Sequence, residues 1–377
     1  MSLIRHLTRI HFGEEVVEEA LAAELARHGV CRPLLLAGFG RAEAALVAML
    51  AAAPPRATVR PVVVPPPAGN DLATTRRLAE GARAAGCDAV VAAGGRRILE
   101  LAKLVALLAV EPEPNCSALG EAAAAVDRGR PGLPLVAIAT TAGAGAEVTA
   151  EATILLGEGR PCRLGGDRLL PAAAILDPIC LDPREPVETA AGAFEALARC
   201  VEAFAAPGYN PPADAVALDG IERIVAALPR ALDHPRDLAA RRELLAGALA
   251  GGLASQKGQG GIEALLRAIQ SLEAPRALPG AVVAALMPHL LVFNAKALGA
   301  RRGALARALT GSAEADPAEA VARLAERAGL GRGLAALGLG PEIVDRAAPL
   351  AEADPASGTN PRRIAAAHYR ALLKAAA

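Results

Sequence analysis

The sequence predicts two domains, an α/β domain with a parallel sheet over residues 1–184 and an all-helical domain over residues 185–377. In the first half, short apolar runs without polar alternation are separated by segments with helical spacing, which is typical of parallel βαβ units. After Leu176-Asp177-Pro178, almost every segment has helical spacing in Ala, Leu, Arg and Glu. A chain of 377 residues also fits two or three domains at about 150 residues each.

The predicted strands of the first domain are short apolar runs bounded by turn residues. They cover Pro33–Ala37, Val59–Val64, Ala89–Ala93 and Leu135–Ala139. The second of these runs into three prolines, which stop any regular element. Between the strands, the apolar spacing predicts helices over Arg41–Ala52, Leu72–Ala85 and Ile98–Val110. Alternating strands and helices of this kind predict a doubly wound sheet.

The second domain consists of predicted helices with no strand between them. They cover Glu188–Phe204, Pro212–Leu228, Leu238–Gln256, Gly261–Leu272 and Ala281–Leu298, with a shorter set to the end of the chain. We find no internal repeat, and the Pro and Gly stretches are typical of turns rather than of linkers.

Composition excludes several classes of function. Forty Lys and Arg balance forty Asp and Glu, so neither nucleic acid nor an anionic membrane is an expected partner. Aromatic residues make up 2% of the chain, with no Trp, which disfavours a stacking platform for bases. No uninterrupted apolar run approaches the roughly 20 residues of a membrane span, and the first residues lack a secretory signal. We therefore expect a cytoplasmic protein, with its six scattered cysteines reduced.

Two loops could hold a phosphate-bearing cofactor. Gly94-Gly95 follows a predicted strand and opens a helix, where backbone N–H groups and the helix dipole favour an anion; a tight turn without a ligand explains this pair equally well. The second loop begins with Thr140-Thr141 and contains Gly143 and Gly145, which combine hydroxyl donors with close backbone approach. A third candidate, Gly38-Phe39-Gly40, fails as a Rossmann fingerprint because Glu43 stands where the last glycine belongs.

Several motifs occur together in an order and spacing that resemble a known family. They are AVVAAGGRRILELAK (89–103), TTAGAGAEVT (140–149), LLPAAAILDP (169–178), TAAGAFEALARCVEAF (189–204), YNPPADAVALDGI (209–221), ALMPHLLVFNAKA (285–297) and NPR (360–362). The chain resembles the iron-containing alcohol dehydrogenase family, including its maleylacetate reductase branch, which has a dehydroquinate synthase-like architecture. The resemblance implies a dinucleotide-binding domain, an all-helical domain and a cleft between them. In that cleft, hydride passes between NAD(P)H and an alcohol or carbonyl compound beside a divalent metal.

The metal-ligand residues that the resemblance implies are absent. The family's one Asp and three His correspond to Glu195, Arg199, Glu263 and Gly280, and a further cleft His corresponds to Arg267. A guanidinium cannot ligate a metal, because it has no free lone pair and stays protonated. No His occurs over residues 29–233 or 235–288, and His289 is expected to be structural. We therefore expect no bound metal, and the Glu and Arg residues four apart on two helices predict ion pairs in its place.

The glycine turn also departs from the family pattern. The family's Gly-Gly-Gly-Ser turn is Gly94-Gly95-Arg96-Arg97 here. Either Arg96 or Arg97 binds phosphate through its side chain, or it fills the pocket and abolishes dinucleotide binding. The sequence does not separate these alternatives.

The leading hypothesis for function is a divergent NAD(P)-dependent alcohol dehydrogenase or carbonyl reductase that acts on a small substrate without iron. Arg199 and Arg267 would orient or polarise the substrate in place of the metal. The expected contacts to NAD or NADP are Gly94, Gly95, Arg96, Arg97, Thr140, Thr141, Gly143 and Gly145.

The rival hypothesis is a catalytically silent family member that keeps the scaffold for binding or assembly; pairing with an active relative is one form of this. A lyase of polyols or sugar phosphates on the same scaffold would also need metal ligands, so it ranks third. The resemblance further implies a homodimer.

Overall fold

The computed structural model describes residues 8–38, 40–52, 60–63, 70–111, 123–125, 129–156, 161–181, 185–272 and 277–377. Contacts among these residues form two compact units. The α/β unit holds residues up to 141 and from 146 to 181, and the helical unit holds residues 142–145 and those from 185 onward. The predicted boundary at residue 184, Phe39 and Cys116 lie outside the described residues.

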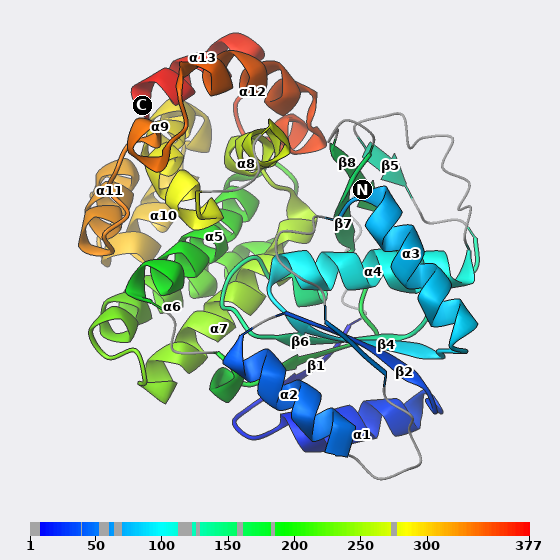
Figure 1. Cartoon of the computed structure of the whole chain (residues 1–377). Helices are drawn as coiled ribbons and strands as arrows, with labels where there is room; N and C mark the ends of the chain where they lie inside the picture. Colours follow the sequence, from blue (N-terminus) through cyan, green and yellow to red (C-terminus); the bar gives the residue numbers. More distant parts are fainter. Residues whose placement is uncertain are drawn as a thin grey trace. The chain divides into compact units, whose positions relative to one another are not determined.

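The α/β unit is built on a parallel sheet with the strand order β1-β9-β6-β4-β2-β3 (Figure 1). Its strands are β1 (Arg9–Phe12), β2 (Pro33–Ala37), β3 (Arg60–Val63), β4 (Ala89–Gly94), β6 (Leu135–Ala139) and β9 (Ala173–Leu176). The central strands β2, β4 and β6 are buried along their whole length, as their unbroken apolar sequences predict.

Helices cover both faces of this sheet. They are α1 (Val17–Arg27), α2 (Arg41–Ala52), α3 (Leu72–Ala84) and α4 (Arg96–Val110). Val90 and Ala92 of β4 pack with α3 and α4, whereas Val91 and Ala93 pack with α1 and α2, because side chains alternate along a strand. In Figure 1 the two pairs of helices lie on opposite sides of the strands. The predicted doubly wound fold is confirmed.

A small second sheet was not predicted. It has the order β5-β8-β7, with β5 (Ala123–Ala125), β7 (Glu151–Leu155) and β8 (Pro161–Gly165). Ala152 and Ile154 of β7 pack against Leu104 and Leu107 of α4. The analysis of the sequence also missed β1, α1 and β9. β1 is mostly exposed, β9 is only four residues long, and α1 is rich in alanine and glutamate, so their apolar patterns are weak.

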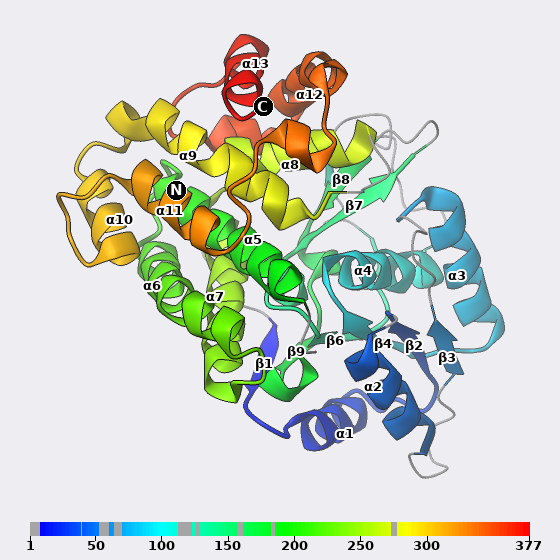
Figure 2. The ribbon, with the colours of Figure 1, turned by 60° about the vertical axis from the view of Figure 1, so that its left-hand side comes forward.

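The helical unit contains α5 to α13 (Figure 2). Their bounds are α5 (Pro186–Ala205), α6 (Pro211–Asp233), α7 (Leu238–Ala254), α8 (Gly261–Leu272), α9 (Pro279–Leu298), α10 (Arg301–Thr310), α11 (Pro317–Arg327), α12 (Pro341–Ala353) and α13 (Ala366–Ala375). Short 3-10 helices are η1 (Ala146–Val148), η3 (Asp167–Leu169), η4 (Pro178–Cys180), η5 (Ser255–Lys257), η6 (Leu334–Leu337) and η7 (Pro355–Thr359). Helix α5 is the central helix, because it packs against α6, α7 and α9.

Helix α9 is the one described helix that is long and apolar enough to cross a membrane by length and composition. Its buried side chains, including Val283, Met287 and Leu290, pack in the core of the helical unit with those of α5. His289 on this helix is half-buried, and burial lowers its pKa.

The described cysteines are free thiols. Cys162, Cys180 and Cys200 are buried, and burial raises the pKa of Cys180 and of Cys200 to about 12. These two thiols therefore stay protonated at neutral pH and pack as small apolar groups.

Candidate functional site

The carboxyl edge of the large sheet contains a topological switch point between β2 and β4. These two strands are neighbours, but the chain leaves β2 through α2 toward β3 on one side and leaves β4 through α4 toward β6 on the other. Ligands of open α/β sheets bind where the connections diverge in this way. The switch point brings Gly38 and Gly40 to the same edge as Gly94 and Gly95.

The turn between β4 and α4 has the geometry of an anion site. Gly95 precedes the first residue of α4, and no side chain caps this 15-residue helix. A Cβ atom placed on Gly95 would lie 3.0 Å from Thr141 Oγ1. The absence of a side chain therefore lets Thr141 lie beside the start of the helix, where the helix dipole favours negative charge.

The two arginines of the turn have different surroundings. Arg96 Nε donates to Glu100 Oε1 at 2.9 Å, and Glu100 Oε2 accepts from the Thr153 N–H at 3.0 Å. Arg96 is thus paired with Glu100 of the same helix, which in turn contacts β7. The Arg97 side chain is exposed. Arg97 is the exposed cation at the N-terminus of α4.

The predicted cofactor contacts in the loop after β6 differ in their surroundings: Thr140 and Gly145 contact other parts of the protein, whereas Thr141 lies beside the α4 turn. The Thr140 hydroxyl is fully buried and donates to Glu43 Oε1 at 2.6 Å, so its side chain faces α2. Gly145 has φ +63°, and a Cβ atom there would lie 2.6 Å from Gly252 Cα of α7. Gly145 is therefore required for packing within the helical unit, and Gly143 is also buried. Thr141 is half-buried and places its hydroxyl beside Gly95 in the α4 turn.

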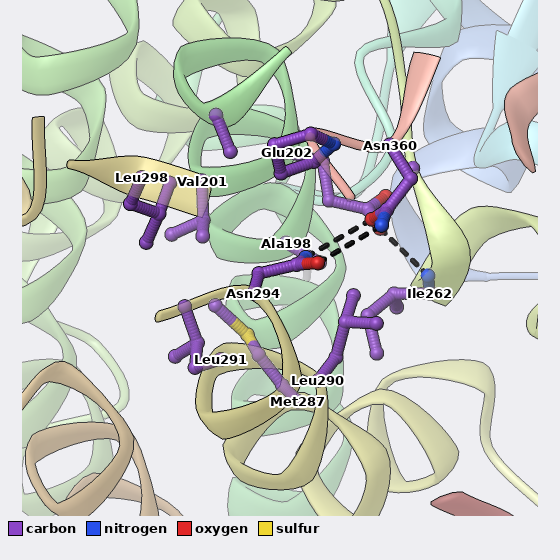
Figure 3. A pocket seen from close by; sticks show the side chains of 13 residues that line it. Ala198, Val201, Glu202, Ile262, Met287, Leu290, Leu291, Asn294, Leu298 and Asn360 are labelled. Carbon is purple, nitrogen blue, oxygen red and sulfur yellow. Dashed lines mark hydrogen bonds between the residues drawn. The ribbon is translucent and has the colours of Figure 1, made fainter. Parts of the chain in front are cut away.

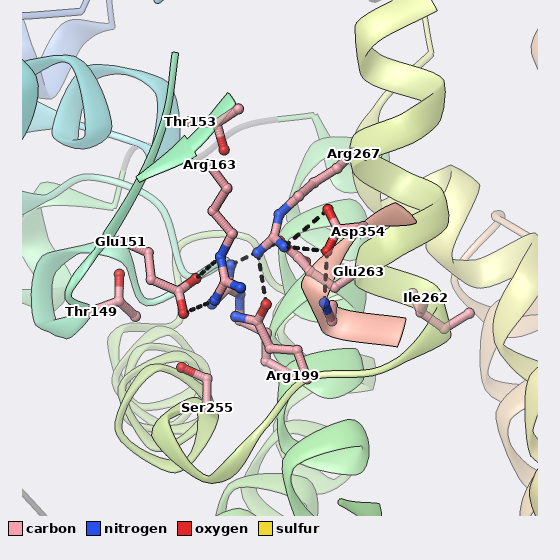
Figure 4. Close-up of polar contacts among 12 residues, drawn as sticks. Thr149, Glu151, Thr153, Arg163, Arg199, Ser255, Ile262, Glu263, Arg267 and Asp354 are labelled. Carbon is pink, nitrogen blue, oxygen red and sulfur yellow. Dashed lines mark hydrogen bonds and ion pairs between the residues drawn. The ribbon is translucent and has the colours of Figure 1, made fainter. Parts of the chain in front are cut away.

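The helical unit contains a buried cluster of charges drawn from distant parts of its sequence (Figure 4). Arg199 Nη2 of α5 lies 3.3 Å from Glu263 Oε1 of α8, and Arg267 Nη2 lies 3.0 Å from the same oxygen. Each of the three side chains is 6% exposed. The Glu263–Arg267 pair predicted from the spacing of four is present, and Arg199 reaches the same carboxylate from another helix.

The two arginines of this cluster differ in how many of their donors are used. Arg267 Nη1 donates to Asp354 at 3.1 Å, and Arg267 Nη2 donates to Gln259 Oε1 at 2.7 Å. These contacts, together with Glu263, fix the Arg267 guanidinium in place. Arg199 Nη1 is buried and has no hydrogen-bond partner among the described residues. A buried donor without an acceptor lowers the stability of the folded state by about 1–3 kcal/mol. An acceptor on a bound ligand would remove this cost at Arg199 Nη1.

Sequence reasoning missed Asp354 and Gln259. Asp354 is 87 residues from Arg267 along the chain, and it also caps η7 by accepting from the Ala356 N–H at 2.8 Å. An Asp before a Pro is a local signal for such a cap, but no local signal indicates a distant arginine.

The other two positions that the resemblance relates to metal ligands, Glu195 and Gly280, do not supply a ligand set. Glu195 is half-buried on α5, one turn before Arg199. Gly280 lies in the first turn of α9, where a Cβ atom would be 1.7 Å from the Ala191 carbonyl oxygen. No group of three or more His, Cys, Asp or Glu among the described residues could hold a metal ion. The Glu263 carboxylate is already bound by two guanidiniums, so these residues do not fit a divalent metal.

Glu202 is a buried carboxyl close to this cluster. Burial raises its pKa to about 7, the charge of Glu263 adds to this effect, and hydrogen bonds from the backbone N–H groups of Ile262, Glu263 and Gly260 oppose it. The carboxyl therefore titrates near neutral pH, far above an ordinary glutamate.

This shift predicts a stability that falls as the pH rises. The folded protein binds the Glu202 proton more tightly than the unfolded chain does, so its contribution is present at low pH and is lost as the pH rises through about 7. The free energy of unfolding should fall by about 2–3 kcal/mol from pH 5 to pH 8 because of this group. Urea unfolding of the wild type and of Glu202→Gln at several pH values measures the effect; an identical pH dependence in both proteins would contradict it.

Comparisons with known proteins agree with this architecture. The family model described as "Iron-containing alcohol dehydrogenase" matches residues 8–178, and "Fe-containing alcohol dehydrogenase family, C-terminal" matches residues 189–377. The chain is 35% identical to the 4-hydroxybutyrate dehydrogenase of Cupriavidus necator, with 99% of each chain covered. It is 31% identical to the maleylacetate reductase of Rhizobium sp. (strain MTP-10005), covering 94% of this chain and 92% of the relative.

Solved structures share the fold. A 1,3-propanediol oxidoreductase matches with a TM-score of 0.88 at 24% identity, and all of both chains is covered. The sulfoacetaldehyde reductase of Bifidobacterium kashiwanohense, solved in complex with NAD+, matches with a TM-score of 0.86 at 21% identity and covers 100% of this chain and 98% of that one.

Proposed function

Because the chain belongs to the iron-containing alcohol dehydrogenase family, we propose that it is an NAD(P)-dependent oxidoreductase that works without bound iron. It interconverts a small alcohol or hydroxy acid and the corresponding carbonyl compound. The unused donor of Arg199, buried beside Glu263, is the observation that carries this proposal.

Arg199 takes the role that a metal has in carbonyl reduction. As the carbonyl carbon accepts hydride, its oxygen gains negative charge, and a positively charged donor in a dry site stabilises that charge. Arg199 Nη1 donates to this oxygen. Arg267 keeps Glu263 in place through its contacts with Asp354 and Gln259. A guanidinium stays protonated, so the proton that completes the alcohol comes from solvent.

The residues at the carboxyl edge of the sheet fit a dinucleotide. Gly94 and Gly95 lead into an N-terminus of α4 that no side chain caps, and Arg97 adds an exposed positive charge. We propose that these residues and Thr141 hold the pyrophosphate of NAD(P)H, which supplies the hydride when bound. Arg96, Gly143 and Gly145 are proposed as further contacts, and Thr140 supports them through Glu43.

Gly95→Ala is expected to weaken NADH binding by about tenfold, because the new Cβ atom would displace Thr141 from the start of α4. Isothermal titration of both proteins with NADH measures the change. The matched control is Gly81→Ala on α3, where a Cβ atom would meet nothing within 4 Å. Equal affinities for Gly95→Ala and the wild type would contradict this assignment.

The test of the proposed function is a fluorescence titration with NADH and NADPH, together with metal analysis of the same sample. The chain has no Trp, so the nicotinamide signal is free of tryptophan background. We expect saturable binding of at least one cofactor and less metal than protein. Failure to bind either cofactor would favour the silent binding partner, and stoichiometric, tightly bound metal would contradict the metal-free site.

A further inference from the structure

The N-terminus of α8 is capped by side chains from other elements. Gly260 precedes the helix and has no side chain of its own to cap it. The Ile262 N–H donates to Glu202 Oε1 at 2.6 Å, and the Glu263 N–H donates to Glu202 Oε2 at 3.2 Å. The Gly261 N–H donates to Asn360 Oδ1 at 3.4 Å. The three N–H groups that open the helix therefore all have acceptors, two of them on one carboxylate of α5.

Asn360 is itself held by a reciprocal amide pair. Asn294 Nδ2 of α9 donates to Asn360 Oδ1 at 3.0 Å, and Asn360 Nδ2 donates to Asn294 Oδ1 at 2.9 Å. Figure 3 shows Glu202, Asn294 and Asn360 around one small cavity. All three side chains are at least nine-tenths buried. The cap is thus built from α5, α9 and the Asn-Pro-Arg segment (360–362), whose role was not apparent from the sequence.

Glu263 connects this cap to the charge cluster. Its backbone N–H is bound by Glu202, and its carboxylate is bound by Arg199 and Arg267. Since Glu263 is the third residue of α8, its side chain moves with the first turn of the helix. A shift of that turn would change the direction in which Arg199 presents its unused donor.

We propose that Glu202 and Asn360 are positioning residues, which hold the first turn of α8 so that Glu263 orients Arg199 toward the substrate. This inference rests on the proposed function for its effect on turnover, but the positioning itself can be measured without substrate. Misplacing a reacting group by about 1 Å costs on the order of 100-fold in rate, so a partial loss of the cap should have a measurable effect.

The experiment compares Glu202→Gln with the wild type at about pH 8.5, above the pKa of about 7 of the buried Glu202 carboxyl, where both of its oxygens are acceptors. Glutamine has nearly the same shape, but it replaces one acceptor oxygen by a donor that faces a backbone N–H. The matched control is Glu222→Gln, an exposed glutamate of α6. Hydrogen exchange of peptides that contain residues 261–264 reports on the cap. Modification of Arg199 by phenylglyoxal, followed by mass spectrometry, reports on the guanidinium.

In Glu202→Gln we expect exchange at the start of α8 to become about five- to tenfold faster and Arg199 to be modified faster. With a carbonyl substrate, kcat should fall about tenfold while the Kd for NADH stays the same.

The proposal is overturned if hydrogen exchange at the start of α8 is unchanged in Glu202→Gln. It is also overturned if the rate of Arg199 modification is unchanged, whatever happens to kcat. If the wild type shows no turnover, the proposed function fails, and exchange and modification still decide the positioning. Should Glu202→Gln not fold, Asn360→Ala tests the same cap from its other side.

Discussion

Replacing Arg199 by methionine is expected to lower kcat by about 10²–10³-fold, because it removes the donor that stabilises the developing negative charge on the substrate oxygen. Methionine fills a similar volume without charge or hydrogen-bond donors. Glu263 keeps Arg267 as a partner at 3.0 Å, so the cluster does not lose all of its positive charge. Steady-state kinetics with NADH and a series of small aldehydes and oxo acids measure kcat and KM.

Two controls separate this role from a general loss of structure. Arg323→Met removes an exposed arginine of α11 and should leave kcat unchanged. Arg199→Lys keeps the charge but not the planar guanidinium, so it should retain only part of the rate. The Kd for NADH should be equal in all these proteins. An Arg199→Met variant that folds normally and keeps the wild-type kcat would disprove the role of Arg199.

Glu263→Gln is expected to lower the free energy of unfolding by about 3–5 kcal/mol, because it removes a buried charge that pairs with two guanidiniums. Arg267 would keep Asp354 as a carboxylate partner, whereas Arg199 would lose its pair with Glu263. Urea unfolding, followed by circular dichroism, measures the change.

The control for Glu263→Gln is Glu319→Gln, since Glu319 forms an exposed pair with Arg323 on α11. It should change the free energy of unfolding by no more than about 0.5 kcal/mol. Combining Glu263→Gln with Arg199→Met should restore part of the lost stability, because one unpaired positive charge leaves the cluster. Similar losses for Glu263→Gln and Glu319→Gln would show that the cluster contributes no more than a surface pair.

Much of the fold could be predicted because its signals are local. The unbroken apolar runs of β2, β4 and β6 indicate buried parallel strands, and the bounds of α8 agree with the predicted helix residue for residue. The small sheet was missed because the burial of β7 and β8 depends on contacts with α4, and β1 was missed because it is a mostly exposed edge strand that pairs with β9.

The candidate site was predictable only in part. The spacing of four that pairs Glu263 with Arg267 is visible in the sequence. Asp354 and Gln259 accept from the two terminal nitrogens of Arg267, whereas Arg199 Nη1 has no hydrogen-bond partner among the described residues, and no local pattern in the sequence indicates this difference.

The sequence by itself determined the family, the central strands β2, β4 and β6 with the helices that follow the first two, and the pairing of Glu263 with Arg267, because each of these depends on residue identity and on spacing along the chain. Only the tertiary structure decided that Thr140 faces Glu43, that Glu202 and Asn360 cap α8, and that Arg199 Nη1 is buried without a hydrogen-bond partner among the described residues. The physical reason is that a buried polar group takes whichever partner lies within hydrogen-bonding distance. For these residues the partners are about 60 to 100 positions away in the chain.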